Sequence, residues 1–494
     1  MKTKAYNPYL PFWETVPDGE PHVFGNRLYI FGSHDARNGD VFCAEDYAGW
    51  SAPLDDLGNW RYEGVIYRKD QDPINGAPYD KTLPEIPEDP LHQVGTMHYL
   101  YAPDVAQGKD GKFYLYYGLD GTNTLSVAVS DTPAGKYEFL DYVRYEDGSP
   151  LKEGLLFDPA ILVEESGNYL YYGFAPALPP EMKKEIIPGA MMVKLADDMH
   201  TVISSPICVA NGSDTAAGTK YEAHPFFEAS SIRKYGDLYY FVYSSLQGHE
   251  LCYGTAPAPE GPFEYRGVIV SNGDIGYNGN TLPVNYMGNN HGGLVEVNGK
   301  HYIFWHRQTH GTCFSRQGCA DEVKILPDGT IPQIEITSCG LNGGPLPARG
   351  EYPSYIACHL TEADRSKVER VMFWMSEADK QPVPEEWPYI TEEHSLNGDH
   401  GLKPFVYNMR TGAVCGFKYF SFDGEENELS AELRGKGTFI LHIDTPEGQT
   451  AARIRADADQ WNIFTVPLEK LSGVHALYFE TESGTFDFAG WKIR

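Results

Sequence analysis

The stretch FFEASSIRKYGDLYYFVYSS, residues 226–245, contains the pattern that decides the fold. Two runs rich in β-branched and aromatic residues flank a turn at Gly236, which is the sequence signature of a β-hairpin. A carboxylate, Glu228, stands at the start of the first run next to Phe226, Phe227 and Ala229. The stretch therefore predicts a hairpin that begins with an ionisable side chain in apolar surroundings.

Four other segments repeat this hairpin. A turn glycine followed by an aromatic-rich strand occurs at Gly25, Gly111, Gly167, Gly236 and Gly299. Further strand-like runs follow three of the hairpins, and we interpret them as outer strands: GNWRYEGVIY from Gly58, GKYEFLDYV from Gly135 and GPFEYRGVIV from Gly261. Five units of four strands, with almost no helical periodicity, predict an all-β fold that begins with a five-bladed β-propeller over residues 1–339.

Each unit also places an ionisable residue seven to nine positions before its turn glycine. These residues are Asp18, Asp104, Asp158, Glu228 and His291. The first strands of propeller blades surround the central channel, so residues at equivalent positions should converge around the axis. A single Asp before a strand is usually a turn residue, but a cluster of like charges costs free energy unless a site uses it. The pattern predicts an acidic functional site at one end of the channel.

The surroundings of these carboxyl groups suggest different roles. Glycoside hydrolysis needs one protonated carboxylic acid and one ionised carboxylate. The apolar neighbours of Glu228 should raise its pKa above the ordinary value of about 4.3, which suits the acid. Asp18 lies in a more polar turn and suits the base, and Asp158 in LFDPAILV is a nearby anion that would raise the pKa of Glu228. Asp104 in YAPDV has two equally supported interpretations: it supports the sugar-binding residues from behind, or it is a structural turn residue.

The composition excludes several classes of partner. The chain has 494 residues and a formal charge of -30, from 39 Lys plus Arg and 69 Asp plus Glu, which argues against nucleic acid and membrane surfaces. The eight cysteines form no CxxC pairs, which indicates free thiols better than a disulfide framework or a zinc site. No apolar run of signal-peptide or membrane-spanning length occurs. We therefore expect a cytoplasmic protein and leave its oligomeric state open.

The segments around three of the carboxylates resemble glycoside hydrolase family 43. PDGEPHVFGNRLYIFGSHD matches the segment of the catalytic base (Asp18), LFDPAILVEESGNYLYYG that of a pKa modulator (Asp158) and FFEASSIRKYGDLYYFVYSS that of the acid (Glu228). The resemblance covers residues 7–339 and implies a five-bladed propeller with inverting chemistry. The family more often has WAPD where this chain has YAPD at 101–104.

The resemblance also implies ligand-binding residues. His291 in NNHGGLVEV matches an axial histidine that commonly faces a central calcium or water, so we expect Ca²⁺ and no organic cofactor. Arg307 in WHRQT resembles an arginine that reaches into the sugar pocket, although it and His34 could equally form ordinary ion pairs. With Asp104, the candidate sugar-binding residues are His34, Tyr101, Arg307, Trp13 and Phe31.

Residues 340–494 have a different pattern. A Gly- and Pro-rich linker, GLNGGPLPARGEYPSY, leads to acidic segments, and seven short strands follow, from VCGFKYFSF to FDFAGWKI. Such spacing predicts a β-sandwich. The run from GFKYFSF to GVHALYFET resembles carbohydrate-binding module family 6. Whether this domain binds sugar, and whether a structural calcium lies near Asp487, stays open.

The expected function is an inverting exo-glycosidase that removes α-L-arabinofuranosyl side groups from arabinoxylan-derived xylo-oligosaccharides. The carboxyl groups of Asp18 and Glu228 should then lie about 6.5–9.5 Å apart. A β-xylosidase is the nearest alternative, because a xylopyranose presents similar hydroxyls. A non-catalytic sugar-binding propeller is another, and a retaining fructosidase is a third, although its NDPNG and EC motifs are absent from the sequence.

Overall fold

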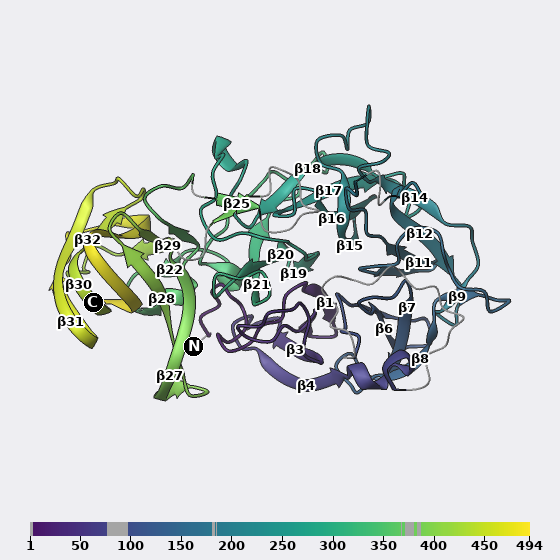
Figure 1. Ribbon diagram of the computed structural model, residues 1–494, viewed down its shortest axis with the longest axis horizontal. Coiled ribbons are helices and arrows are strands. Elements are labelled where there is room, and N and C mark those ends of the chain that lie inside the picture. Colours follow the sequence, from purple (N-terminus) through teal and green to yellow (C-terminus); the bar gives the residue numbers. More distant parts are fainter. Residues whose placement is uncertain are drawn as a thin grey trace.

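The computed structural model describes residues 3–76, 97–179, 183, 185–366, 368–370, 380–382 and 387–494. A ring of five β-sheets lies beside a C-terminal β-domain (Figure 1). Helical elements in the described chain are short: α1 (Pro73–Gly76), η1 (Lys69–Gln71), η2 (Tyr277–Gly279), η3 (Gly340–Asn342) and η4 (Ser354–Ile356). No described helix has the length and apolar composition needed to cross a membrane. The prediction of an all-β propeller followed by a sandwich is confirmed.

Four of the five blades contain four antiparallel strands each. From the axis outward these are β1 (Glu20–Phe24), β2 (Arg27–Phe31), β3 (Tyr47–Pro53) and β4 (Arg61–Tyr67); β5 (Asp104–Gln107), β6 (Phe113–Gly118), β7 (Leu125–Ser130) and β8 (Glu138–Tyr142); β10 (Ala160–Glu164), β11 (Gly167–Tyr172), β12 (Gly189–Leu195) and β14 (Ile207–Asn211); β15 (Phe226–Tyr235), β16 (Leu238–Ser245), β17 (Glu250–Ala256) and β18 (Glu264–Ser271). Two short strands, β9 (Arg144–Tyr145) and β13 (Thr201–Val202), extend the third sheet.

The fifth blade has three strands, β19 (Leu294–Val297), β20 (Lys300–Gln308) and β21 (Arg316–Val323). The prediction of four strands in every unit is therefore wrong for this blade. The chain after β21 contains Pro327 and Pro332, which cannot donate hydrogen bonds to a sheet. This segment instead packs against the fourth blade, where the Ile334 N–H donates to the carbonyl of Ile269 at 2.9 Å.

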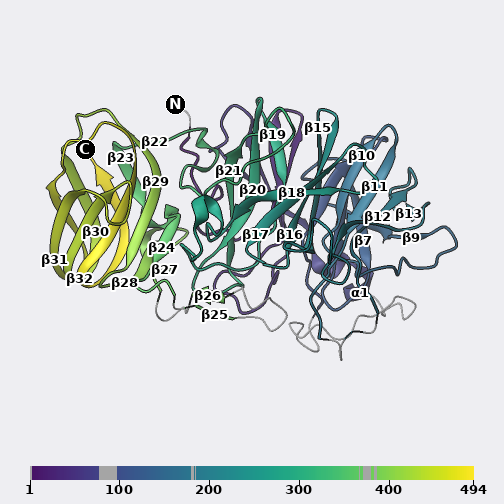
Figure 2. The ribbon, with the colours of Figure 1, turned by 90° about the horizontal axis from the view of Figure 1, so that it is seen from above.

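The inner strands close the ring. In chain order β1, β5, β10, β15 and β19 each contact the next, and β19 contacts β1. A parallel bridge between Gly19 and Gly292 joins the first and last blades. Figure 2 shows the ring from its edge, with the strands running from one face to the other. Because every inner strand starts at the same face, residues at these starts meet around the axis.

Aromatic side chains fill the spaces between blades. Tyr171 of β11 packs on Phe241 of β16 with ring centroids 5.8 Å apart, and Tyr9 packs on Phe304 of β20 at 5.1 Å. Such pairs contribute about 0.5–1.5 kcal/mol beyond the burial of their area. The repeated aromatic residues of the second strands therefore form the contacts that hold neighbouring blades together.

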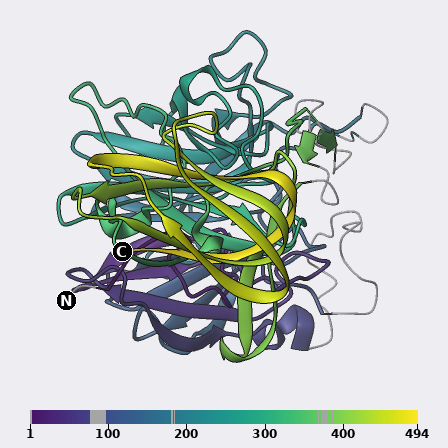
Figure 3. The same ribbon diagram turned by 90° about the vertical axis from the view of Figure 1, so that its left-hand side faces the viewer.

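The C-terminal domain is built around a few long strands. Its elements are β22 (Leu346–Pro347), β23 (Gly350–Pro353), β24 (His359–Thr361), β27 (Tyr389–Asp399), β28 (Leu402–Arg410), β29 (Val414–Phe422), β30 (Glu428–Ile443), β31 (Thr450–Pro467) and β32 (Gly473–Ile493), with a separate pair, β25 (Val368–Arg370) and β26 (Lys380–Pro382). One edge of β32 pairs with β30, and its other edge pairs in turn with β29, β28 and β23. Figure 3 shows the long strands of this domain curving past one another. Their buried side chains, among them Phe417, Phe479 and Trp491, form its core.

Three glycines explain why this domain has fewer and longer strands than predicted. The sequence suggests turns near Gly435, Gly437 and Gly484, but all three lie inside strands at positive φ. A Cβ at Gly437 would lie 1.9 Å from the Ser483 carbonyl oxygen, and one at Gly484 would lie 1.9 Å from that of Lys436. These glycines allow β30 and β32 to approach each other closely, so they mark backbone contact rather than chain reversal.

The hairpin of β27 and β28 contacts the propeller. Glu392 of β27 lies 2.9 Å from Arg37 Nε of the first blade and 2.6 Å from His310 Nε2 of the fifth. At the tip of the hairpin, the ring of His400 lies 4.1 Å from that of Trp13. The C-terminal domain therefore bonds to two loops of the propeller, those that contain Arg37 and His310.

Candidate active site

All five ionisable residues lie at the same end of the ring. Asp18, Asp158 and His291 come just before the inner strands β1, β10 and β19, whereas Asp104 and Glu228 lie inside β5 and β15. Contacts join several of them across blades. The Ala229 N–H, next to Glu228, donates to Asp158 Oδ2 at 2.9 Å, and His291 Nδ1 lies 3.6 Å from the same oxygen. The protein's inner strands thus bring together residues more than 130 positions apart in the chain.

Arg316, the first residue of β21, organises the carboxylates of the first blade. Its Nε and Nη2 donate to the two oxygens of Asp35 at 2.8 Å each, a bidentate pair with good geometry. Its Nη1 donates to Asp18 Oδ1 at 3.0 Å. The Phe42 ring covers the guanidinium at 4.8 Å. Asp35 therefore fixes Arg316, and Arg316 fixes Asp18.

Asp18 has a second partner in His306 of β20. The Asp18 N–H donates to His306 Nδ1 at 3.3 Å, and the other ring nitrogen, Nε2, lies 2.6 Å from the Asn289 carbonyl, to which it donates. The side chain of Asp18 is 4 % exposed. Burial alone would raise the pKa of Asp18, but Arg316 and His306 outweigh it and hold the pKa below its usual range. This carboxyl group is therefore ionised at neutral pH.

Glu228 and Asp158 behave in the opposite way. Burial and the negative charge of Asp18 raise the pKa of Glu228 to about 8, although Arg316 opposes the shift. Burial and the charges of Glu228 and Asp18 also raise the pKa of Asp158, against the hydrogen bond from Ala229. One guanidinium, already paired with Asp35, cannot also balance the charges of Asp18, Asp158 and Glu228. The pair therefore retains a proton near neutral pH while Asp18 stays charged, as an acid and base pair requires.

Further along the inner strands β1, β5 and β15, charged side chains bond to one another across the channel. Arg233 of β15 donates to Glu20 Oε2 at 2.8 Å and to the Pro21 carbonyl at 2.9 Å. His22 Nε2 lies 2.6 Å from Asp104 Oδ1, and Asp104 is fully buried. Asp104 also accepts from the Ile161 N–H at 2.8 Å. Asp104 is thus bonded within the channel, so of its two predicted roles it fits a residue that supports the site from below, and its burial leaves no surface for direct contact with a sugar.

Two buried polar atoms at the axis are unsatisfied. Within the described residues, Glu20 Oε1 and His291 Nε2 have no hydrogen-bond partner, and they lie 4.0 Å apart. Burial lowers the pKa of His291 to about 4, although Asp18 opposes this, so the imidazole is neutral at pH 7 and has a lone pair to offer. Burial raises the pKa of Glu20 to about 8 although Arg233 opposes it, so a cation bound here would replace the proton of this carboxyl group. One carboxylate oxygen and one imidazole fit a cation that keeps most of its water ligands.

Aromatic side chains flank the carboxylates. Tyr101, Phe157, Phe174 and Phe227 form a continuous series of ring contacts with centroids 5.1–5.2 Å apart, from the second blade to the fourth. Phe157 and Phe174 are partly exposed, and they neighbour Asp158 and Glu228. Tyr101 is therefore placed where the sequence predicts an aromatic wall, and Phe157 and Phe174 add to that wall.

Other predicted sugar-binding residues have different surroundings. Arg307 is buried on the opposite face of β20 from His306, where it donates to Gln317 Oε1 at 2.9 Å and to the Ala357 carbonyl at 3.0 Å. These bonds face the C-terminal domain, so its prediction as a sugar ligand is contradicted. Phe31 is 1 % exposed and packs with Phe24 between blades, which contradicts its predicted stacking on a sugar.

The remaining two lie at the rim of the first blade. His34 Nε2 lies 2.8 Å from Glu14 Oε1, while its Nδ1 lies 2.8 Å from the Asp46 carbonyl. Trp13 packs on Trp50 with ring centroids 5.6 Å apart and remains partly exposed. Both side chains reach solvent at the face on which the carboxylates converge, at the edge rather than at the axis.

Sequence reasoning missed Arg316, Asp35 and His306. The positional rule used for the first strands would have found Arg316, because the third strand of a blade starts at the same face as the first. Arg316 opens β21 in that position. His306 and Asp35 lie near or just beyond the ends of second strands, which finish at this face too.

The chain was compared with known proteins. The family model described as Glycosyl hydrolases family 43 matches residues 27–331. A xylosidase/arabinosidase of Thermoclostridium stercorarium is 46% identical over 490 residues, covering 97% of this chain and 96% of the relative, and a xylosidase/arabinosidase of Bacteroides ovatus is 31% identical, covering 68% and 99%.

A solved structure is also similar. CoXyl43, described as a family 43 β-xylosidase/α-arabinofuranosidase from a compost microbial metagenome in complex with xylotriose in a calcium-free form, is 26% identical with a TM-score of 0.50. The match covers 68% of this chain and 98% of that one. The chain belongs to glycosyl hydrolases family 43, and the protein is a glycoside hydrolase of the xylosidase/arabinosidase type.

Proposed function

We propose that the protein is an inverting exo-glycosidase that releases terminal α-L-arabinofuranosyl groups from arabinose-substituted xylo-oligosaccharides. The observation that carries this proposal is the opposite shift of two carboxyl groups at one site. Asp18 is held ionised by Arg316, while Glu228 has a pKa of about 8. Inverting hydrolysis uses this division between a base and an acid.

Asp18 is the base that activates water. Arg316 Nη1 donates to Oδ1 at 3.0 Å, which leaves Oδ2 to accept a proton from the attacking water. That water attacks the anomeric carbon on the face opposite the leaving group, and the configuration at this carbon inverts. Arg316 keeps the carboxylate in position without taking the proton itself.

Glu228 is the acid. At pH values below about 8 its carboxyl group carries the proton that the departing glycosidic oxygen needs. Asp158 supports this role by its position, since its Oδ2 accepts from the N–H of Ala229, the neighbour of Glu228, at 2.9 Å. Tyr101, Phe157 and Phe174 are placed to pack against the apolar side of a pentose.

We further propose that a hydrated Ca²⁺ occupies the axial site next to Glu20 and His291. The unsatisfied Glu20 Oε1 and His291 Nε2 support this assignment. The ion would supply a fixed positive charge beneath the carboxylates. His291 would hold its water shell from one side while its Nδ1, 3.6 Å from Asp158 Oδ2, faces the catalytic residues.

Xylosidase activity is a second candidate. The names of the two curated relatives above combine both activities, which supports release of β-D-xylosyl groups at the same site. The test compares kcat/KM for nitrophenyl α-L-arabinofuranoside and nitrophenyl β-D-xylopyranoside. A higher value for the arabinofuranoside supports the proposal, and a clear preference for the xylopyranoside replaces it with xylosidase activity.

Two further outcomes separate the other classes. A Glu228→Gln variant should lose hydrolysis of oligosaccharides, whereas the matched surface change Glu296→Gln should not, since Glu296 is half exposed. Equal, negligible turnover in all three proteins would indicate a non-catalytic sugar-binding propeller. Proton NMR of the first product formed should show the inverted anomer, and an anomer of retained configuration would favour a fructosidase-like mechanism.

A further inference from the structure

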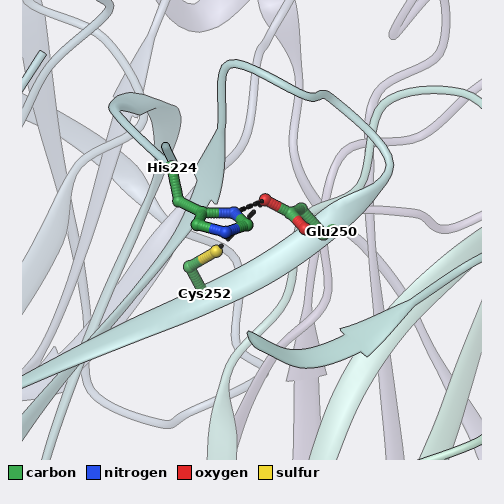
Figure 4. Close-up of side chains that lie close together, drawn as sticks. All are labelled: His224, Glu250 and Cys252. Carbon is green, nitrogen blue, oxygen red and sulfur yellow. Dashed lines mark hydrogen bonds and ion pairs between the residues drawn. The ribbon is translucent and has the colours of Figure 1, made fainter. Parts of the chain in front are cut away.

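Outside the catalytic carboxylates, the fourth blade contains a compact group of three different metal-ligating side chains (Figure 4). His224 precedes β15, and Glu250 and Cys252 project from the same face of β17. Their ligand atoms all lie within 4.8 Å of one another. His224 Nδ1 is 2.5 Å from Glu250 Oε1, and Cys252 Sγ is 3.4 Å from the same oxygen. None of these residues has a role in the hydrolysis proposed above.

We propose that His224, Glu250 and Cys252 form a binding site for one Zn²⁺-class cation. Thiolate, imidazole and carboxylate are the usual ligands of zinc, at metal–ligand distances of about 2.0–2.3 Å, which in a tetrahedron separates ligand atoms by roughly 3.3–3.6 Å. The Cys252–Glu250 distance of 3.4 Å already fits. The His224–Glu250 distance of 2.5 Å must open by about 1 Å, so the bond between the two gives way to bonds with the ion.

Of the three side chains only that of His224 reaches solvent, so an ion would enter the site from the side of His224. Cys252 is fully buried and Glu250 is nearly so, whereas the side chain of His224 is 29% exposed. His224 stands on the segment before β15, so it can adjust while the two strand residues stay fixed. A fourth position on the His224 side remains for water, as in zinc sites with three protein ligands.

Neighbouring groups orient the ligands. The Ser245 hydroxyl donates to Glu250 Oε1 at 2.5 Å, and the Tyr265 ring stacks on His224 with centroids 5.3 Å apart and an interplanar angle of 11°. The Tyr243 hydroxyl donates to the His224 carbonyl at 2.8 Å. The Ser245 bond sets the direction of the Glu250 carboxyl group, and the Tyr265 ring sets that of the His224 imidazole.

The site is chemically distinct from the axial site. A buried thiol selects soft or borderline cations and disfavours Ca²⁺ and Mg²⁺, which prefer oxygen.

The site is connected to the catalytic acid through the sheet. In the ladder of β15 and β16, Phe226 pairs with Ser245 and Glu228 pairs with Ser244. A cation bound by His224 would link the entry of β15 to β17, two strands away from the axis. The ligands lie beside the active site without touching its three carboxyl groups.

The test uses the full-length protein after treatment with a chelator, titrated with Co²⁺ as a spectroscopic substitute for Zn²⁺. Wild-type protein should bind one equivalent with a thiolate-to-cobalt charge-transfer band and the intense visible bands of tetrahedral cobalt, and Zn²⁺ should displace it. His224→Ala and Cys252→Ser should weaken binding by about 10–100-fold or more, since even the loss of a residue that only hydrogen-bonds to a ligand costs that much. Cys208→Ser is the matched control, because Cys208 is the exposed thiol.

His224→Ala keeps the test valid if Cys252→Ser folds poorly, because His224 is partly exposed. The proposal is overturned if saturating Co²⁺ gives no charge-transfer band in wild-type protein. It is equally overturned if the band persists unchanged in His224→Ala, or if Cys208→Ser abolishes it. None of these results depends on hydrolytic activity, so they are independent of the proposed function.

Discussion

Arg316 reaches Asp18 with only one of its three nitrogens, because the other two, Nε and Nη2, donate to Asp35. The 3.0 Å contact from Nη1 to Asp18 Oδ1 is therefore directional and cannot shift without breaking the bidentate pair at 2.8 Å. A compact ammonium group could neutralise one carboxylate but could not hold both in this geometry.

An Arg316→Lys variant should accordingly lose activity at low pH. Loss of the guanidinium removes the charge contact that holds the pKa of Asp18 down, so its folded-state pKa rises. The acid limb of kcat/KM should then move to higher pH, and the maximum should fall by about 100-fold or more. A variant whose acid limb coincides with that of the wild type would show that Arg316 does not control the base.

Replacement of the acid should increase stability while it removes catalysis. The pKa of Glu228 is about 8 in the folded protein and about 4.5 when unfolded, so the unfolded state releases its proton first. Stability contributed by this group is present below about pH 4.5 and is lost as the pH rises toward 8. Glu228→Gln should therefore melt at least about 2 °C higher than wild type at pH 8.

The comparison at pH 4 is the control for that prediction. There the carboxyl group is protonated in both states, so the difference in melting temperature should largely disappear. A lower melting temperature for Glu228→Gln at pH 8 would mean that the ionised Glu228 carboxylate does not destabilise the folded protein.

Removal of the axial cation should lower stability. Treatment with EGTA should lower the melting temperature, because Glu20 Oε1 and His291 Nε2 would again be buried without partners. Added Ca²⁺ should restore it in wild-type protein, and His291→Ala should respond much less. A melting temperature insensitive to EGTA and Ca²⁺ would favour water at this position.

The C-terminal domain should influence catalysis through Glu392. This residue bridges Arg37 and His310, and His310 Nδ1 lies 3.1 Å from the hydroxyl of Ser315, the neighbour of Arg316. Glu392→Gln should lower kcat/KM several-fold and destabilise the protein by about 1.5–3 kcal/mol, since hydrogen bonds to charged groups are lost.

The adjacent Glu393 provides the control. It faces the other side of β27, where it bonds to Arg434 at 2.9 Å and to Trp461 within the C-terminal domain. Glu393→Gln should leave kcat/KM unchanged. Equal effects of the two changes on activity would mean that the contact with the propeller loops is not responsible.

The convergence of Asp18, Asp158 and Glu228 could be predicted from the sequence, because a propeller brings equivalent positions of its inner strands together around the axis. The same rule could not show that Asp104 is bonded to His22 and fully buried rather than open to solvent. The prediction that Arg307 binds the sugar failed for another reason. Residues alternate across a strand, so His306 faces Asp18 while Arg307 faces the C-terminal domain, and a single resemblance could not decide between neighbours.

The long strands of the C-terminal domain show a second limit. Glycines near positions 435 and 484 are typical of turns, and nothing local distinguishes a turn glycine from one needed for close contact between strands. That distinction depends on Ser483 and Lys436, which approach only in the folded chain. The group of His224, Glu250 and Cys252 was missed because its members are spread over two segments without a metal-binding motif.

The role of Glu228 is tested by the pH dependence of kcat/KM in wild type and in Glu228→Gln, with a nitrophenyl arabinofuranoside that retains measurable turnover without an acid. Wild-type activity should fall as the pH rises through about 8, where Glu228 loses its proton, and this limb should disappear in the variant. A limb near pH 8 that persists in Glu228→Gln, or full activity of the variant on oligosaccharides, would contradict the assignment of Glu228 as the acid opposite Asp18.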